Sequence, residues 1–101
     1  MDLDMNLKKL QASADDACRL IKVLSNRERM MLLCQIGRGE KCVRELEGCL
    51  DIRQPTLSQQ LAVLRNEDLV KTRREGRKIY YSLSSHVALA VIRVLNQDCC
   101  S

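Results

Sequence analysis

Aromatic residues are nearly absent from this sequence, which has no Phe, no Trp and two Tyr among its 101 residues. The core must therefore be built from Leu, Ile, Val, Met and Cys side chains. Proteins that bind RNA or single-stranded DNA stack the bases on exposed aromatic rings. Tyr80 and Tyr81 are the only aromatic residues, and this scarcity argues against both functions. No run of residues is long and apolar enough to cross a membrane, so no membrane partner is expected.

Histidine is equally scarce, because His86 is the only one in the chain. A zinc site of the kind built from several His and carboxylate ligands is therefore not predicted, and His86 is expected on the surface in the first turn of the last helix. No Ser–His–Asp or Cys–His–acid spacing is present, nor is a Gly-rich loop that could hold a phosphate. The sequence therefore predicts neither an enzyme nor a cofactor.

The first residues, MDLDMNLKK, lack the basic-then-apolar order of a signal peptide, so a cytoplasmic protein is expected. The chain has six cysteines. Cysteines in a reducing compartment are not expected to form structural disulfides. Metal binding or redox chemistry is the better expectation for them.

Positive charge is concentrated between residues 53 and 81, in RQPTLSQQLAVLRNEDLVKTRREGRKIYY. This segment carries seven Lys or Arg and three Asp or Glu, and its net charge of +4 equals that of the whole chain. A local excess of this kind attracts phosphate whatever the base sequence. A segment with this much charge is more often simply a solvated hairpin. Here an amphipathic helix precedes the expected hairpin, and this order favours DNA binding.

Apolar spacing predicts the helices, and alternation predicts the strands. Asn26 is expected to cap the second helix, Pro55 to occupy the first position of the fourth, and Gly76 to lie in the hairpin turn. The expected elements, in chain order, are helices from about 7 to 25, 27 to 37 and 43 to 50, a fourth from Pro55, strands 69–74 and 78–83, and a last helix 85–98. Residues 1–101 are thus expected to form one mainly α-helical domain with a β-hairpin wing, a winged helix-turn-helix.

Polar side chains at the start of the fourth helix are predicted to face the major groove of double-stranded DNA, and the basic side chains of the hairpin are predicted to hold phosphates or the minor groove. Glutamine is well suited to the first task because its amide can pair with adenine through two hydrogen bonds. The predicted DNA-binding residues are Gln54, Thr56, Ser58, Gln59, Gln60, Arg73, Arg74, Arg77 and Lys78.

The blocks QPTLSQQLAVLRNEDLV and RREGRKIYYSL closely resemble the recognition helix and wing of the ArsR/SmtB family of bacterial repressors. The resemblance covers essentially the full length of the chain. It implies a homodimer that binds an inverted repeat in operator DNA and releases it when an inducer is sensed, with the first and last helices at the dimer interface. A shared dimer core would also suit a chain of this small size.

Within this family the sequence most resembles the BigR/SqrR/HlyU group, whose members sense reactive sulfur species through two cysteines. The resemblance implies that Cys34, in the second helix, pairs with Cys100 or with Cys99 at the end of the last helix. On its own sequence context, Cys34 would instead be a small buried hydrophobic residue, since free cysteine is often buried.

A thiolate sensor of arsenite or cadmium is the alternative. Sensors of that type carry several cysteines at the start of the third helix, where this chain reads EKCVRELE and keeps only Cys42. A soft metalloid needs two or three converging thiolates, and Cys49 is about two helical turns away. Cys18 is expected at the interface or in the core. A third class, a non-sensing architectural or protein-binding domain, would leave all the cysteines incidental.

Overall fold

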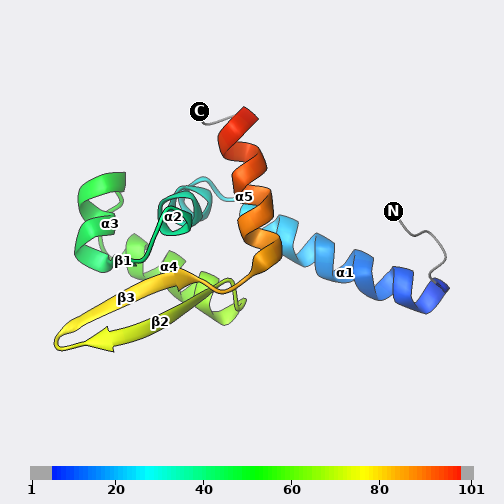
Figure 1. The fold of residues 1–101 in the computed structure, drawn as a ribbon, viewed down its shortest axis with the longest axis horizontal. Helices are drawn as coiled ribbons and strands as arrows, with labels where there is room; N and C mark the ends of the chain where they lie inside the picture. Colours follow the sequence, from blue (N-terminus) through cyan, green and yellow to red (C-terminus); the bar gives the residue numbers. More distant parts are fainter. Residues whose placement is uncertain (1–5, 99–101) are drawn as a thin grey trace.

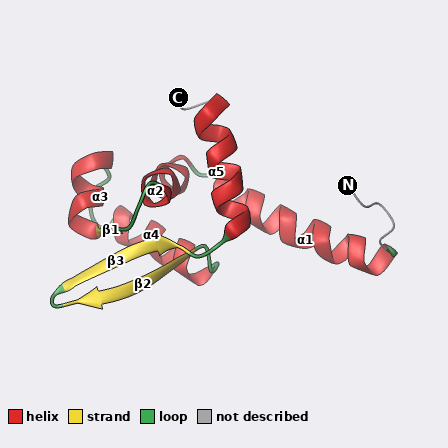
Figure 2. Cartoon of the chain, viewed as in Figure 1, coloured by secondary structure: helices red, strands yellow, loops and turns green. Residues whose placement is uncertain are grey.

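The structure, a computed structural model, describes residues 6–98 and has the expected winged helix-turn-helix architecture (Figures 1 and 2). Its elements are α1 (Leu7–Leu24), α2 (Arg27–Gly37), β1 (Lys41–Cys42), α3 (Val43–Leu50), α4 (Thr56–Asn66), β2 (Val70–Glu75), β3 (Lys78–Leu83) and α5 (His86–Asp98). None of these helices is long and apolar enough to cross a membrane.

Side-chain caps fix where several of the helices begin. The Asn26 side chain accepts a hydrogen bond from the backbone of Arg29 at 3.0 Å, so the predicted cap of α2 is confirmed. Ser85 caps α5 in the same way, since its hydroxyl accepts from the backbone N–H of Ala88 at 3.1 Å. Such bonds satisfy N–H groups at a helix start that have no partner within the helix.

The start of α4 differs by one residue from the prediction. Pro55 was expected at the first helical position, but the helix begins at Thr56 and Pro55 occupies the capping position. Proline has no side-chain acceptor, and the Gln54 side chain supplies one instead. Its Oε1 accepts from the backbone N–H of Ser58 at 3.2 Å and from the Ser58 hydroxyl at 2.6 Å.

The sheet has a third strand that was not predicted. β1 pairs antiparallel with β3, with Lys41 opposite Tyr81 and Cys42 opposite Tyr80, which gives the strand order β1-β3-β2. A strand of two residues is too short to show alternation in a sequence. The predicted hairpin is confirmed: Glu75 lies opposite Lys78, and Gly76 opens the two-residue turn with a φ of +62° that glycine adopts without strain.

The hydrophobic core is aliphatic and lies between α2, α3, α4 and α5. Leucine side chains of the three central helices are fully buried in it, together with one residue of α5. These residues are Leu32, Leu33, Leu46, Leu57, Leu61, Leu64 and Ile92. Close packing of the core holds α4 against the scaffold, and this leaves the opposite face of α4 at the surface.

The outer faces of α1 and α5 remain uncovered. Figure 1 shows α1, in blue, extending away from the rest of the fold. Its apolar residues Leu7, Leu10 and Ile21 are more than half exposed, and so are Val87 and Val94 on α5. An isolated domain gains nothing from apolar stripes that it leaves in water. His86, at the start of α5, is exposed as expected.

Candidate nucleic-acid interface

The first turns of α4 present polar side chains to solvent. Ser58 and Gln59 are exposed, and Thr56 is half-buried. Ser58 and the exposed Gln54 are joined by the hydrogen bonds that cap the helix. Hydrogen bonds within the protein thus hold Gln54 and Ser58. Gln59 is exposed, and none of the hydrogen bonds described between residues 6 and 98 involves its side chain.

Gln60 is placed differently from its neighbour. It is half-buried, and its Oε1 accepts a hydrogen bond from Nη1 of Arg29 on α2 at 3.1 Å. The position follows from helix geometry, because residue 60 lies beside the buried stripe formed by Leu57, Leu61 and Leu64. Gln59 is turned by about 100° from Gln60 around the helix axis.

The hairpin contacts α4 through β2, and its turn projects away from the helices (Figure 2). Arg74, Arg77 and Lys78 lie exposed at or near its turn. Other basic residues of the segment, Arg53, Arg65 and Lys71, are exposed as well. Most of the predicted residues at the start of α4 and in the hairpin are thus exposed, and their contact with DNA stays a prediction.

Arg73 is exposed but is paired with carboxylates of the same chain. Its guanidinium forms a two-bond ion pair with Glu40, at 2.8 Å from Nε and 2.7 Å from Nη2, and a third bond of 2.7 Å to Glu75. Its charge also lies 4.6 Å from the centre of the Tyr80 ring. The Arg73 hydrogen bond holds the pKa of Glu40 below its ordinary value, and the carboxylates raise the pKa of Arg73. A phosphate must displace a carboxylate to pair fully with Arg73.

The cysteines occupy separate parts of the fold. Cys34 is half-buried on α2 and packs against the core. Cys18 on α1 and Cys49 near the end of α3 are exposed, so Cys18 does not lie in the core as one prediction allowed. Cys99 and Cys100, the predicted partners of Cys34, lie outside the described residues.

Cys42 has a structural role at the start of α3. It is buried, and its backbone N–H donates to Oε1 of Glu45 at 3.0 Å. Hydrogen bonds from the backbone and the thiol of Cys42 lower the pKa of Glu45. The aligned positions of the metalloid motif hold Arg44 and Glu47, both exposed. Between residues 6 and 98, no group of three His, Cys, Asp or Glu side chains is placed to hold a metal.

Comparison with known proteins identifies the family. The model of the bacterial regulatory protein, arsR family, matches residues 26–72. A biofilm growth-associated repressor of Agrobacterium fabrum is 43% identical over 98 residues, which cover 97% of this chain and 84% of the relative. The chain belongs to the ArsR family. It is therefore a DNA-binding transcriptional repressor of the ArsR/SmtB type and not an enzyme.

Solved structures of ArsR-family relatives share the whole fold. Reduced HlyU from Vibrio cholerae superposes with a TM-score of 0.89 at 36% identity, covering 94% of this chain and 100% of that one. The transcriptional repressor BigR from Xylella fastidiosa gives a TM-score of 0.85 at 39% identity, covering 96% and 99%. The resemblance to the BigR and HlyU group inferred from the sequence is thus confirmed.

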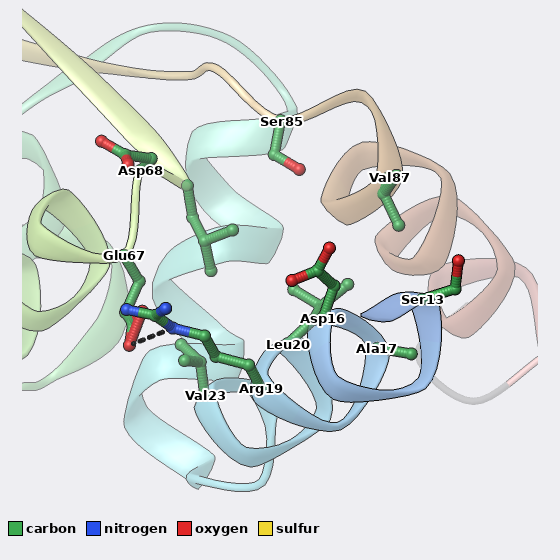
Figure 3. Close-up of a pocket in the computed structure, with 11 residues that line it drawn as sticks. Ser13, Asp16, Ala17, Arg19, Leu20, Val23, Glu67, Asp68, Ser85 and Val87 are labelled. Atoms are coloured by element: carbon green, nitrogen blue, oxygen red, sulfur yellow. Dashed lines mark hydrogen bonds and ion pairs between the residues drawn. The ribbon is translucent and has the colours of Figure 1, made fainter. Parts of the chain in front are cut away.

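A groove of about 510 Å³ lies between α1, the turn after α4 and the start of α5 (Figure 3). Leu20 and Val23 of α1 line one side, and Val87 of α5 lines another. The ion pair between Arg19 and Glu67, 2.8 Å long, borders it. This groove lies between α1 and α5, the two helices that also carry exposed apolar residues.

Sequence reasoning missed Glu40 and Arg29. Both act on residues of the predicted DNA-binding set, Glu40 on Arg73 and Arg29 on Gln60. The partners lie 33 and 31 positions apart in the chain. No local pattern links such positions, so only the folded structure brings them together.

We expect Glu40→Gln to strengthen binding to DNA of any sequence and to make its salt dependence steeper by up to about one unit. The amide cannot hold Arg73 as an ion pair, so Glu75 alone still competes with a phosphate for the guanidinium. Fluorescence anisotropy with a scrambled duplex at several salt concentrations measures this. Glu47→Gln is the matched control, because it removes the same charge from exposed α3. Equal gains from both variants would attribute the effect to net charge alone.

Acid should have a related effect on stability. The pKa of Glu40 is lowered from 4.5, so its ion pair contributes stability above that pH. This contribution is lost as the pH falls through the lowered pKa in the folded state. The thermal unfolding temperature, measured between pH 2 and pH 7, should therefore fall less steeply toward acid pH for Glu40→Gln than for the parent.

Proposed function

We propose that this protein is a homodimeric repressor of the bacterial cytoplasm that binds an inverted repeat in double-stranded operator DNA. It releases that DNA when persulfide, polysulfide or a related oxidant joins Cys34 to Cys100 or Cys99. The observation that carries the DNA-binding part is that the polar start of α4 and the basic turn of the hairpin are both exposed. Resemblance to the BigR and HlyU group supports the sensing part.

The DNA contacts divide between the two elements. Ser58 and Gln59 on α4, with Thr56 and Gln54 at its start, would face the base edges of the major groove. Arg74, Arg77 and Lys78 would hold phosphates or the minor groove, and Arg73 would join them after leaving Glu40. Side chains of the first kind carry sequence information, and side chains of the second kind position the protein.

Homodimer formation is supported by the exposed apolar residues of α1 and α5 and by the groove between these helices. A two-fold axis through this surface would place the two α4 helices on successive half-sites. We expect sedimentation velocity at micromolar concentration to show a dimer. Ile21→Glu should shift it toward monomer, whereas Lys22→Glu on the same turn should change it less. A monomeric parent, both free and on DNA, would contradict this interface.

Cys34 is in a position from which a covalent change could reach DNA-binding elements. It packs against the core from α2, and α2 contacts α1, α4 and α5. A bond from Cys34 to a residue just beyond α5 would tie α2 to the end of the proposed dimer helix. The dimer could then move toward an arrangement of the two α4 helices with lower DNA affinity.

The proposed chemistry needs only two thiols and a sulfane sulfur. The thiolate of one cysteine attacks a terminal sulfur of the inducer polysulfide, forming a Cys–S–S bond while the inducer leaves as a shorter polysulfide anion. The second thiolate then attacks Sγ of the first cysteine and expels the outer sulfur as hydrosulfide, which leaves a disulfide. If the intermediate retains a longer chain and an internal sulfur is attacked, a polysulfide bridge forms instead.

Operator release tests this function against its alternatives. We would select a bound sequence from a random library and add polysulfide, arsenite or cadmium to the complex under otherwise identical conditions. Release by polysulfide alone, reversed by dithiothreitol, is the expected result. Release by arsenite or cadmium at stoichiometric concentration would favour a thiolate metalloid site that includes Cys42. Absence of release by all three would favour an architectural domain.

A further inference from the structure

Arg29 connects three helices at one point. From the start of α2, its Nε donates to the carbonyl oxygen of Val23 at 2.7 Å and its Nη2 to that of Lys22 at 3.4 Å. Its Nη1 donates to Oε1 of Gln60, on α4, at 3.1 Å. One guanidinium thus joins the end of α1 to the middle of α4.

We propose that Arg29 is a positioning residue that fixes the rotation of α4 about its own axis, with Gln60 as the anchor of that helix rather than a reader of bases. This inference rests on the proposed binding of operator DNA. It replaces the prediction from sequence that Gln60 faces the major groove.

The α1 end of this connection is a favourable site for a cation. The last carbonyl groups of a helix lack partners within the helix and carry its negative dipole end. Ser25 satisfies part of this need, because its hydroxyl donates to the Lys22 carbonyl at 2.8 Å. Arg29 adds two donors, Nε and Nη2, and a full positive charge. Its side chain is therefore held against the end of α1 independently of its bond to α4.

The α4 end of the connection uses an acceptor at a defined angular position. Gln60 follows Leu57 by three residues and precedes Leu64 by four, so it lies next to the buried stripe. A hydrogen bond at the edge of this stripe resists rotation of α4 about its axis. The apolar contacts of the leucine residues restrict that rotation less sharply, because they have no preferred direction. Any rotation of α4 would move Gln59 and Ser58 relative to the base edges together.

A second contact joins the same two helices. Arg19 of α1 pairs with Glu67, the residue that caps the end of α4, with bonds of 2.8 and 3.3 Å from the Arg19 Nε. Exposed pairs of this kind contribute little stability. Its importance is geometric, because α1 is then connected to α4 both at the middle and at the end. A shift of α1 in the dimer can therefore reach the recognition helix.

This role predicts a particular pattern of DNA binding. A variant without the anchor should lose discrimination at every base pair read by α4, while its phosphate contacts and salt dependence stay unchanged. A variant of a base-reading residue loses discrimination at one or two base pairs. The two roles can thus be separated by binding measurements on single-substitution operator duplexes.

Gln60→Glu and Gln60→Leu provide the decisive comparison, with Gln59→Glu and Gln59→Leu as matched controls. Glutamate keeps the acceptor for Arg29 but cannot pair with adenine, because it lacks the amide N–H group. Affinities for the selected operator and for a scrambled duplex give a ratio for each variant, so that a general effect of the added charge cancels.

We expect Gln60→Glu to keep this ratio within about threefold of the parent and Gln60→Leu to lose about tenfold, the effect of one hydrogen bond to a charged group. For Gln59→Glu, the preference for the operator over the scrambled duplex should be lost. If Gln60→Glu loses as much as Gln59→Glu, Gln60 reads bases and the proposal is wrong. If Gln60→Leu keeps the parent ratio, the anchor does not exist.

Nitrogen-15 NMR of the Arg29 side chain tests the contact without DNA. The Nη1 group should show the chemical shift of a hydrogen-bonded nitrogen in the parent and in Gln60→Glu, and it should lose that shift in Gln60→Leu, whereas the bonds to α1 remain. A parent that selects no DNA sequence would overturn the proposed function. In that case the Arg29 signals would still decide whether the anchor is present.

Discussion

Cys34→Ser is expected to bind operator DNA as the parent does and to remain bound when polysulfide is added. A hydroxyl group fits nearly the same half-buried space on α2 but forms neither a persulfide nor a sulfur bridge. In the parent, the inducer should lower operator affinity by about 10- to 100-fold, the usual range of allosteric coupling. In the variant we expect a change of less than about twofold. Gel-shift titrations with and without polysulfide measure both.

The second thiol needs a double variant, because Cys99 and Cys100 are neighbours and one can replace the other. Cys99→Ser/Cys100→Ser should therefore lose the response more completely than either single change. Mass spectrometry of the treated parent should find the peptide with Cys34 linked to the C-terminal peptide, with extra sulfur atoms if the bridge is a polysulfide.

The remaining cysteines serve as controls. Cys18→Ser and Cys49→Ser replace exposed thiols and should respond normally. Cys42→Ser should also fold, because serine suits a helix-capping position better than cysteine. A normal response of Cys34→Ser, or loss of the response in Cys42→Ser alone, would contradict the proposed pair and favour the metalloid site.

Gln59→Ala and Arg77→Ala should weaken DNA binding in different ways. Gln59 is exposed on α4, so its loss should remove about 1–3 kcal/mol of discrimination at particular base pairs. Arg77 lies in the hairpin turn, and its loss should weaken binding to all sequences and reduce the salt slope by about one. Titrations against single-substitution operators at several salt concentrations separate the two effects.

Arg73→Ala provides the internal comparison for this experiment. Because Arg73 already pairs with Glu40 and Glu75, its loss should reduce the salt slope less than the loss of Arg77. Circular dichroism would establish that each variant is folded. If Gln59→Ala weakened all sequences alike, or Arg77→Ala affected only certain bases, the assignment of α4 and the wing would be wrong.

The sequence was sufficient for most of the scaffold. Leucine spacing identified α3 and α4, Asn26 was confirmed as a cap, and Gly76 was confirmed in the hairpin turn. These features are local, because a cap, a turn or an amphipathic stripe is set by residues within a few positions of one another. The family motif then supplied the relation between helix and wing.

Contacts between distant positions were not predictable in the same way. The leucine spacing along α4 places Gln60 beside the buried stripe, but it does not identify Arg29 as the partner of Gln60. Likewise, the charge count of the wing treated Arg73 as equal to Arg77, although Glu40 holds only the former. Both cases depend on tertiary pairing over more than 30 positions, which carries no signal in a single sequence.

The short strand β1 has a consequence for the range of DNA shapes that the protein can accept. Pairing of Lys41 and Cys42 with Tyr81 and Tyr80 joins the base of the hairpin to the residue that caps α3. The base of the wing therefore moves with the helix-turn-helix unit, and adjustable geometry is confined to the residues beyond Arg73 and Tyr80. Such a wing tip can follow a wider or narrower minor groove beside each half-site. In the proposed DNA complex this pairing would keep the separation between the wing base and the recognition helix constant. We therefore expect the protein to tolerate changes in flanking sequence more readily than changes in half-site geometry.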